Sequence, residues 1–167
     1  MDYIVEYKGI GNGKYEIDYH IDKVFFSQIE DAQFSDGNVE VKVFMTVFSG
    51  GLEFEFRISG TLKTECDRCL EEFDMPIKGK FNMSVKFAEK ASEPEDADEE
   101  ICLSLEDTSI DLKQHIYEFV VLSAPLRHLH KEKDCNKEIL KAINSINEVS
   151  EDDNEIDPRW EKLKSLL

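Results

Sequence analysis

Alternating apolar and polar residues predict two long β-strands in the first half of the chain. From Val39 to Phe48, and again from Leu52 to Ser59, every second residue is apolar, and a Gly-Gly turn signal separates the two runs. Because successive side chains of a strand point to opposite faces, this period of two places one face of each strand in a core. Further strand-like segments lie at residues 3–7, 15–19, 70–87 (interrupted at Pro76 and Gly79) and 101–105.

Helical periodicity predicts one main helix, at about residues 109–122. Polar residues suited to an N-cap stand at its start, and Pro125 follows its end. A short helix is predicted at residues 22–29, and a weaker amphipathic pattern predicts another at 136–146. The apolar stripe of the main helix consists of Leu112, Ile116, Phe119 and Val120.

These elements predict an α+β fold: an antiparallel β-meander or partly open barrel packed with the main helix, followed by a flexible helical C-terminal tail. We expect residues 1–135 to form a single α+β domain and residues 136–167 to form an acidic, helical tail. Residues 89–100 are acidic and lack large apolar side chains, so they predict a disordered loop. Near the end of the tail, Trp160 lies in a short predicted helix that either docks on its own domain or anchors a partner.

The chain of 167 residues carries a formal net charge of −17. A chain this acidic should repel nucleic acid at long range, because polyanion binding depends on neutralising phosphates. The charge is unevenly distributed, since the segment from Arg57 to Lys90 holds seven basic and six acidic residues (7 − 6 = +1). If RNA is bound, we expect this central segment to supply the surface.

The same sequence predicts a cytoplasmic protein without membrane contact. No apolar run approaches the roughly 20 residues that span a bilayer, and the first residues do not read as a signal peptide. Four unevenly spaced cysteines favour a reducing compartment over a disulfide framework.

Cys66 and Cys69 form a Cys-x-x-Cys pair between two strand-like runs. This spacing suits half of a zinc site, because a two-residue turn lets both sulfurs face one ion. The remaining candidate ligands are His128, His130, Cys135 and Cys102. Cys66, Cys69, His128 and Cys135 would complete a tetrahedral site if the loop after the main helix reaches the hairpin.

Two other interpretations of the cysteine pair stay open. A redox dithiol fits less well, because such a pair usually opens a helix and this one lies between β-runs. The interpretation that we favour is a pair of structural thiols at the end of a hairpin, with no cofactor and with zinc as the alternative. Cys102 is expected to be a small hydrophobic residue within a strand.

Other motifs of catalytic chemistry are absent from the sequence. The chain has no phosphate-cradling glycine loop, no nucleophile elbow and no His-Glu-x-x-His motif. Glu118, beside the apolar stripe of the main helix, is a candidate partnered carboxylate, although an exposed acid is the commoner case. We therefore expect a protein that is not an enzyme and that acts on no small-molecule substrate.

Three landmarks resemble the YceD family of large ribosomal RNA subunit accumulation proteins. They are the Cys66–Glu71 segment, the Asp111–Pro125 helix region after an acidic loop, and the closing segment Asp157–Leu163. The resemblance implies a non-catalytic, cytoplasmic bacterial protein that supports synthesis, processing or accumulation of large-subunit ribosomal RNA. Genes of this family often neighbour that of a large-subunit ribosomal protein. Many relatives carry a second cysteine cluster that would complete a metal site, where this chain has only Cys135.

Two modes of action follow from the resemblance and the charge. In the first, a ribosome-biogenesis factor binds large-subunit rRNA or a ribonucleoprotein through Lys63, Arg68 and the cysteine hairpin. In the second, an adaptor binds a basic ribosomal protein through its acidic segments and the Trp160 tail, without touching RNA. A zinc-binding structural module is a further alternative, and a redox or metal-dependent enzyme is the least favoured hypothesis.

Overall fold

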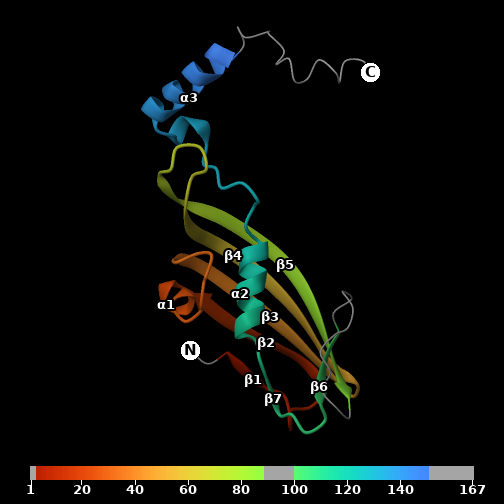
Figure 1. Ribbon diagram of the computed structural model, residues 1–167. Coiled ribbons are helices and arrows are strands. Elements are labelled where there is room, and N and C mark those ends of the chain that lie inside the picture. The colour runs from red at the N-terminus through yellow and green to blue at the C-terminus, as the bar shows by residue number, and fades with distance from the viewer. Residues whose placement is uncertain (1–2, 89–99, 151–167) are drawn as a thin grey trace, which may run out of the picture.

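The computed structural model describes residues 3–88 and 100–150, and it confirms an α+β fold (Figure 1). Strands dominate, with three α-helices and one 3-10 helix among the described residues. The elements in chain order are β1 (Ile4–Glu6), β2 (Gly13–Ile21), α1 (Lys23–Phe26), β3 (Gly37–Phe48), β4 (Gly51–Glu65), β5 (Glu72–Ala88), β6 (Glu100–Ser104), β7 (Ser109–Asp111), α2 (Lys113–Leu122), η1 (Glu132–Asp134) and α3 (Lys137–Ser150).

One five-stranded sheet, in the order β2-β3-β4-β5-β6, forms the body of the molecule. Strands β2 to β5 make the predicted antiparallel meander. The expectation of a purely antiparallel sheet is wrong at its edge, because β6 pairs with β5 in parallel. Parallel neighbours cannot be joined by a tight hairpin turn, and eleven residues, 89–99, separate β5 from β6 in the sequence. The sheet is mixed and open, so it does not form a closed barrel.

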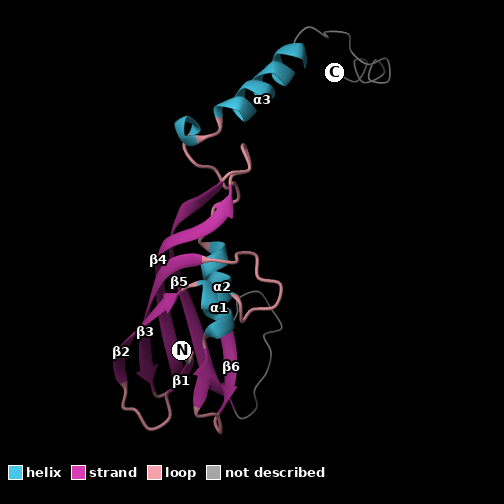
Figure 2. Cartoon of the chain, turned by 90° about the vertical axis from the view of Figure 1, so that its left-hand side faces the viewer, coloured by secondary structure: helices cyan, strands magenta, loops and turns pink. Residues whose placement is uncertain are grey.

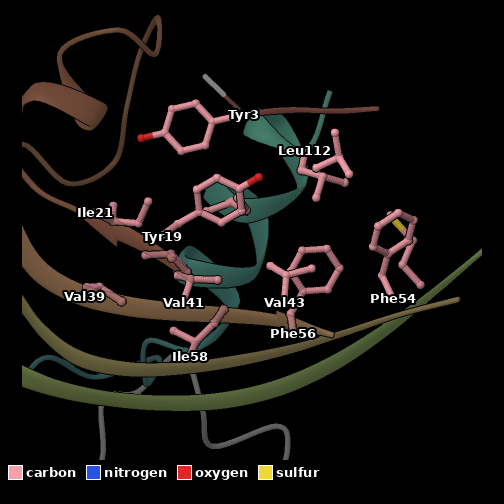
Figure 3. Close-up of a cluster of buried hydrophobic side chains, with 14 of the residues drawn as sticks. Tyr3, Tyr19, Ile21, Val39, Val41, Val43, Phe54, Phe56, Ile58 and Leu112 are labelled. Carbon is pink, nitrogen blue, oxygen red and sulfur yellow. The ribbon is translucent and has the colours of Figure 1, made fainter. Parts of the chain in front are cut away.

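The inner face of this sheet is covered by α1, α2 and the small β1–β7 pair, which bury one hydrophobic core. The alternating residues of β3 and β4 supply ten of its buried residues, as the sequence predicts. Leu112 at the N-cap of α2, and Ile116 and Val120 within the helix, are fully buried. Figure 3 shows Tyr3 and Tyr19 closing one side of this core, where their rings stack with centroids 5.3 Å apart.

The main helix is shorter than predicted, because α2 begins at Lys113 rather than near residue 109. Residues 109–111 instead form β7, which pairs with β1. The side chain of Asp111 accepts a hydrogen bond of 2.8 Å from the backbone N–H of Lys113, so it satisfies one donor of the first turn. Strand β1 lies more than a hundred residues away in the sequence, so local periodicity does not indicate this pairing.

The predicted interruption of the 70–87 run is also wrong, since β5 continues through Pro76 and Gly79. Fifteen residue pairs with β4, from Gly51↔Lys86 to Glu65↔Glu72, hold the strand despite the N–H that proline lacks. Gly79 is required for another reason. A β-carbon at this position would collide with the Ser123 side chain at the end of α2.

Several predictions for the acidic segments and the tail lie outside the described residues. They concern the loop at 89–99, the acidic stretch beyond residue 150 and the short helix with Trp160. Within the described part of the tail, α3 confirms a helix near the predicted 136–146. None of the helices in the described ranges is long and apolar enough to cross a membrane.

We predict that Gly60→Ala destabilises the fold. Gly60 has φ +154° in the middle of β4, and an added β-carbon would collide with the backbone of Asn38 and Val39 on β3. The expected loss is about 1–3 kcal/mol in the free energy of unfolding, from backbone strain and displaced strands. Urea denaturation measures it. Gly11→Ala is the matched control, because a β-carbon there meets no atom within 4 Å, and an equal loss in both variants would contradict the prediction.

Candidate metal centre

The Cys66–Cys69 pair lies in the connection between β4 and β5, at the hairpin end that the sequence predicts. The backbone N–H of Cys66 donates to the carbonyl of Glu71 at 2.9 Å, and that of Leu70 donates to the carbonyl of Cys66 at 2.8 Å. Leu70 takes a left-handed conformation with φ 60°, which closes the turn. Both thiols are consequently directed into the hairpin, where they are buried.

The loop after α2 returns to this hairpin and is fastened to it at Asp67. The backbone N–H of Asp67 donates to the carbonyl of His128 at 2.8 Å. In the other direction, the N–H of His128 donates to the Asp67 carboxylate at 2.7 Å. These two hydrogen bonds bring the chain that follows His128 against the cysteine pair.

Four potential metal ligands meet there: Cys66, Cys69, His130 and Cys135. Their sulfur and nitrogen atoms all lie within 4.8 Å of one another. In a tetrahedral zinc site with Zn–S bonds of about 2.3 Å, neighbouring sulfurs are about 3.8 Å apart, so this group has the dimensions of a metal site. The three thiols are at most 4% exposed.

The histidine of this group corrects the sequence prediction, which placed His128 beside the three cysteines. The His128 ring lies instead against Phe34, with centroids 5.7 Å apart, and its Nδ1 is 3.3 Å from the hydroxyl of Thr64. The backbone of His128 is hydrogen-bonded to Asp67, and the ring of His130 faces the thiols. The two histidines are two residues apart in the loop after α2, so only their contacts distinguish them.

His130 is oriented as metal-binding histidines usually are. Its Nε2 is 3.1 Å from the sulfur of Cys69, and its Nδ1 is 3.3 Å from the carbonyl of Lys131. When Nδ1 carries the proton and donates to that carbonyl, Nε2 keeps a free lone pair for a metal ion. The ring of Phe73 packs edge-on against the imidazole at 5.1 Å and restricts its rotation.

Backbone N–H groups surround the thiols of the hairpin. Burial raises the pKa of Cys66, but N–H groups of Arg68, Cys69 and His130 donate to its sulfur, and the resulting pKa is below the ordinary value. The pKa of Cys69 is likewise lowered against the effect of burial, by N–H groups of Asn136 and Glu71. Such donors stabilise the thiolate, which is the form that ligates metals.

Cys135 differs, because burial and the neighbouring sulfur of Cys69 raise its pKa. Arg68, the residue between the paired cysteines, directs its guanidinium toward it, with Nη1 3.7 Å from the Cys135 sulfur. Arg68 was predicted as part of an RNA-binding surface. Its half-buried side chain contacts the cysteine cluster.

The other predicted site residues lie apart from this cluster. Lys63 is exposed on β4, with its Nζ 3.8 Å from the carboxylate of Glu72. Glu118 is an exposed acid on α2 that accepts a hydrogen bond of 2.8 Å from Gln114. Cys102 lies in β6 opposite Lys86, at the far end of the β4–β5 ladder from the hairpin. Trp160 falls outside the described residues.

The cysteine cluster also joins α3 to the body of the protein. Ile139 and Leu140 of α3, together with Phe73 of β5, pack against the three buried cysteines in a small second core. The side-chain amide of Asn136 donates to Glu71 at 3.0 Å, and its oxygen accepts from the N–H of Glu138 at the start of the helix. Figure 2 shows α3 projecting beyond the end of the sheet from this point.

We predict that mild oxidation of metal-free protein with diamide forms a disulfide between two of the three cluster cysteines, Cys66, Cys69 and Cys135, and leaves Cys102 reduced. The sulfurs of the cluster lie within 4.8 Å of one another, whereas Cys102 lies in a distant strand. Peptide mapping by mass spectrometry measures the linkage. A disulfide formed mainly through Cys102 would contradict this prediction.

The comparisons with known proteins identify one family. No curated protein and no solved structure matches the chain. A family model, that of the large ribosomal RNA subunit accumulation protein YceD, matches residues 54–167. The match begins in β4 and includes the hairpin, α2 and all four residues of the cluster. The chain therefore belongs to the YceD family, whose description ties its members to the accumulation of large-subunit ribosomal RNA.

Proposed function

We propose that this protein is a non-catalytic, cytoplasmic ribosome-biogenesis factor that supports accumulation of large-subunit rRNA by binding a precursor of the large subunit. The observation that carries the proposal is the cysteine–histidine cluster, because it lies inside the region that matches the YceD family. The cluster connects two segments about 60 residues apart and fixes a projecting helix. This arrangement suits a binding protein that must present a defined surface.

The four residues of the cluster fit zinc. Three thiolates and one imidazole are a common donor set of structural zinc sites, in which four protein ligands leave no open position for substrate. Cys66, Cys69, His130 and Cys135 would hold the ion, and the ion would supply cross-linking rather than Lewis-acid chemistry. The N–H donors at the thiolates and the carbonyl beside His130 provide the surrounding hydrogen bonds that such sites require.

A second candidate function is an adaptor that binds a basic ribosomal protein without touching RNA. The net charge of −17 favours this alternative, since it attracts basic partners and repels nucleic acid at long range. Part of the apolar side of α3, including Ile143, is only half-buried and is available to a partner. In this case α3 and the acidic segments of the tail would form the binding surface.

We predict that the purified protein binds one zinc ion and that His130→Ala reduces the zinc content, while His128→Ala retains it. Only His130 brings a ring nitrogen to the thiols. Metal analysis by inductively coupled plasma mass spectrometry, after purification without chelators, measures the occupancy. Less than about half an equivalent in the wild type, or equal losses in both histidine variants, would rule out this site.

We predict that Cys66→Ser/Cys69→Ser fails to restore large-subunit rRNA in cells that lack the chromosomal copy of the gene, while Cys102→Ser restores it. The double change removes half of the ligands that fix α3, and Cys102 lies outside the cluster. The measurement is the ratio of large- to small-subunit rRNA. If even the wild-type protein leaves this ratio unchanged, the proposed function is wrong.

Affinity purification at increasing salt separates the two candidates. Direct RNA binding predicts that rRNA remains bound after the ribosomal proteins are stripped away. The adaptor predicts that rRNA leaves together with them. Either result is compatible with the family, and each identifies one mode of action.

A further inference from the structure

Arg68 directs its side chain toward one ligand of the candidate metal centre from a position next to another. It directly precedes Cys69 in the hairpin, and its Nη1 is 3.7 Å from the sulfur of Cys135, within hydrogen-bonding range of sulfur. Cys135 is 67 residues further along the chain, so this contact joins the hairpin to the segment that leads into α3. A half-buried charge needs a partner, and here the partner is a thiol.

The carboxylates of the hairpin do not explain this orientation of Arg68. Asp67, Glu71 and Glu72 each have another hydrogen-bond or ion-pair partner. None of the ion pairs found within residues 3–88 and 100–150 includes Arg68. Its guanidinium therefore serves the sulfur cluster rather than a neighbouring acid.

The three thiols of the cluster differ in the groups that stabilise their negative charge. Burial raises the pKa of each, but backbone N–H groups donate to the sulfurs of Cys66 and Cys69 and bring the pKa of both below the ordinary value. For Cys135, burial and the neighbouring sulfurs raise the pKa, and the positive charge of Arg68 opposes that rise. Cys135 is therefore the ligand that depends on a side chain for a stable thiolate.

The charge of a zinc-loaded cluster gives the guanidinium a second use. Three thiolates and one neutral imidazole around a divalent ion leave one net negative charge. This charge would lie among thiols that are at most 4% exposed, in a chain whose net charge is already −17. A buried charge without a counter-charge is costly, and Arg68 is the cation whose donor group reaches the sulfurs.

We propose that Arg68 is a positioning residue of the metal centre: its guanidinium donates to the Cys135 thiolate and supplies the counter-charge that keeps this ligand on the ion. The inference rests on the zinc site of the proposed function, and it assigns Arg68 to that site in place of an RNA-binding surface. Because Cys135 lies two residues before the start of α3, Arg68 also contributes to fixing the projecting helix.

The test is the zinc affinity of the full-length protein, measured at fixed pH by competition with a chromophoric chelator. Arg68→Met removes the charge and the donors but keeps an unbranched side chain, and it should weaken zinc binding about 10–100-fold. Arg68→Lys keeps the charge without the planar fork of donors, so its loss should be smaller. If Arg68→Met does not fold, Arg68→Gln takes its place and should show the same loss.

Lys63→Met is the matched control for the lost charge. It removes one positive charge from an exposed side chain of β4, whose ammonium group lies near Glu72 and outside the cysteine cluster. Its zinc affinity should equal that of the wild type. Equal losses in Lys63→Met and Arg68→Met would overturn the proposal, because they would reflect the overall charge of the hairpin rather than the contact with Cys135.

Cobalt(II) in place of zinc gives a readout that a purely structural role of Arg68 would not change. Cobalt bound by thiolates shows sulfur-to-metal charge-transfer absorption, whose energy falls when a thiolate loses a hydrogen bond and a neighbouring cation. At saturating cobalt, the band of Arg68→Met should therefore lie at longer wavelength than the bands of the wild type and of Lys63→Met. An unshifted band in folded, cobalt-loaded Arg68→Met would contradict the proposed contact.

The possible results separate the role of Arg68 from the proposed function. Wild-type protein that binds no zinc would overturn the metal centre, and the role of Arg68 with it. If the wild type binds zinc and Arg68→Met binds it equally well, only the role of Arg68 is wrong. Restoration of large-subunit rRNA by the wild-type protein in cells tests the proposed function independently of both results.

Discussion

The antiparallel pairing of β4 with β5 runs unbroken from Gly51↔Lys86 to Glu65↔Glu72, and it positions the cysteine cluster relative to the core. One end of this ladder carries the cysteine turn, while its outer face carries Arg57 and Lys80 in a single row. Its inner face supplies the apolar residues that hold α2. Because a strand shows alternate residues to opposite sides, the same two strands contribute to the core on one side and to the exposed face of the sheet on the other.

The cysteine–histidine cluster replaces a hydrophobic core where the chain is too polar to form one. Only Phe73, Ile139 and Leu140 pack beside the three thiols, and this small area of apolar contact is a weak anchor for a projecting helix. A metal ion bound by four ligands would hold the helix far more strongly, since structural zinc sites contribute directly to folding. The two Asp67–His128 hydrogen bonds and the Asn136–Glu71 hydrogen bond align the hairpin with the segment that follows α2 even without an ion.

The acidic charge of the chain is unevenly distributed along the sequence. On the outer face of the sheet, Glu16, Asp18 and Glu55 pair with Lys42, Arg57 and Lys80. Many of the other acidic residues lie in the sequence segments 89–99 and 151–167. The net negative charge disfavours indiscriminate binding to nucleic acid through repulsion at long range. The projecting α3 leaves a surface for a protein partner, which is the part of the molecule that the adaptor mode of action would use.

Local pattern was sufficient for the α+β class, for the inward faces of β3 and β4, for the apolar stripe of α2 and for the hairpin position of Cys66 and Cys69. Each of these depends on neighbours a few residues apart. Tertiary structure alone decided that β6 runs parallel to β5, that residues 109–111 pair with β1, and that His130 rather than His128 meets the thiols. It also aligned Lys42, Arg57 and Lys80, which are scattered in sequence. These outcomes arise from contacts between segments far apart in the chain, as between Cys69 and His130, which are 61 residues apart, and no local period encodes such contacts.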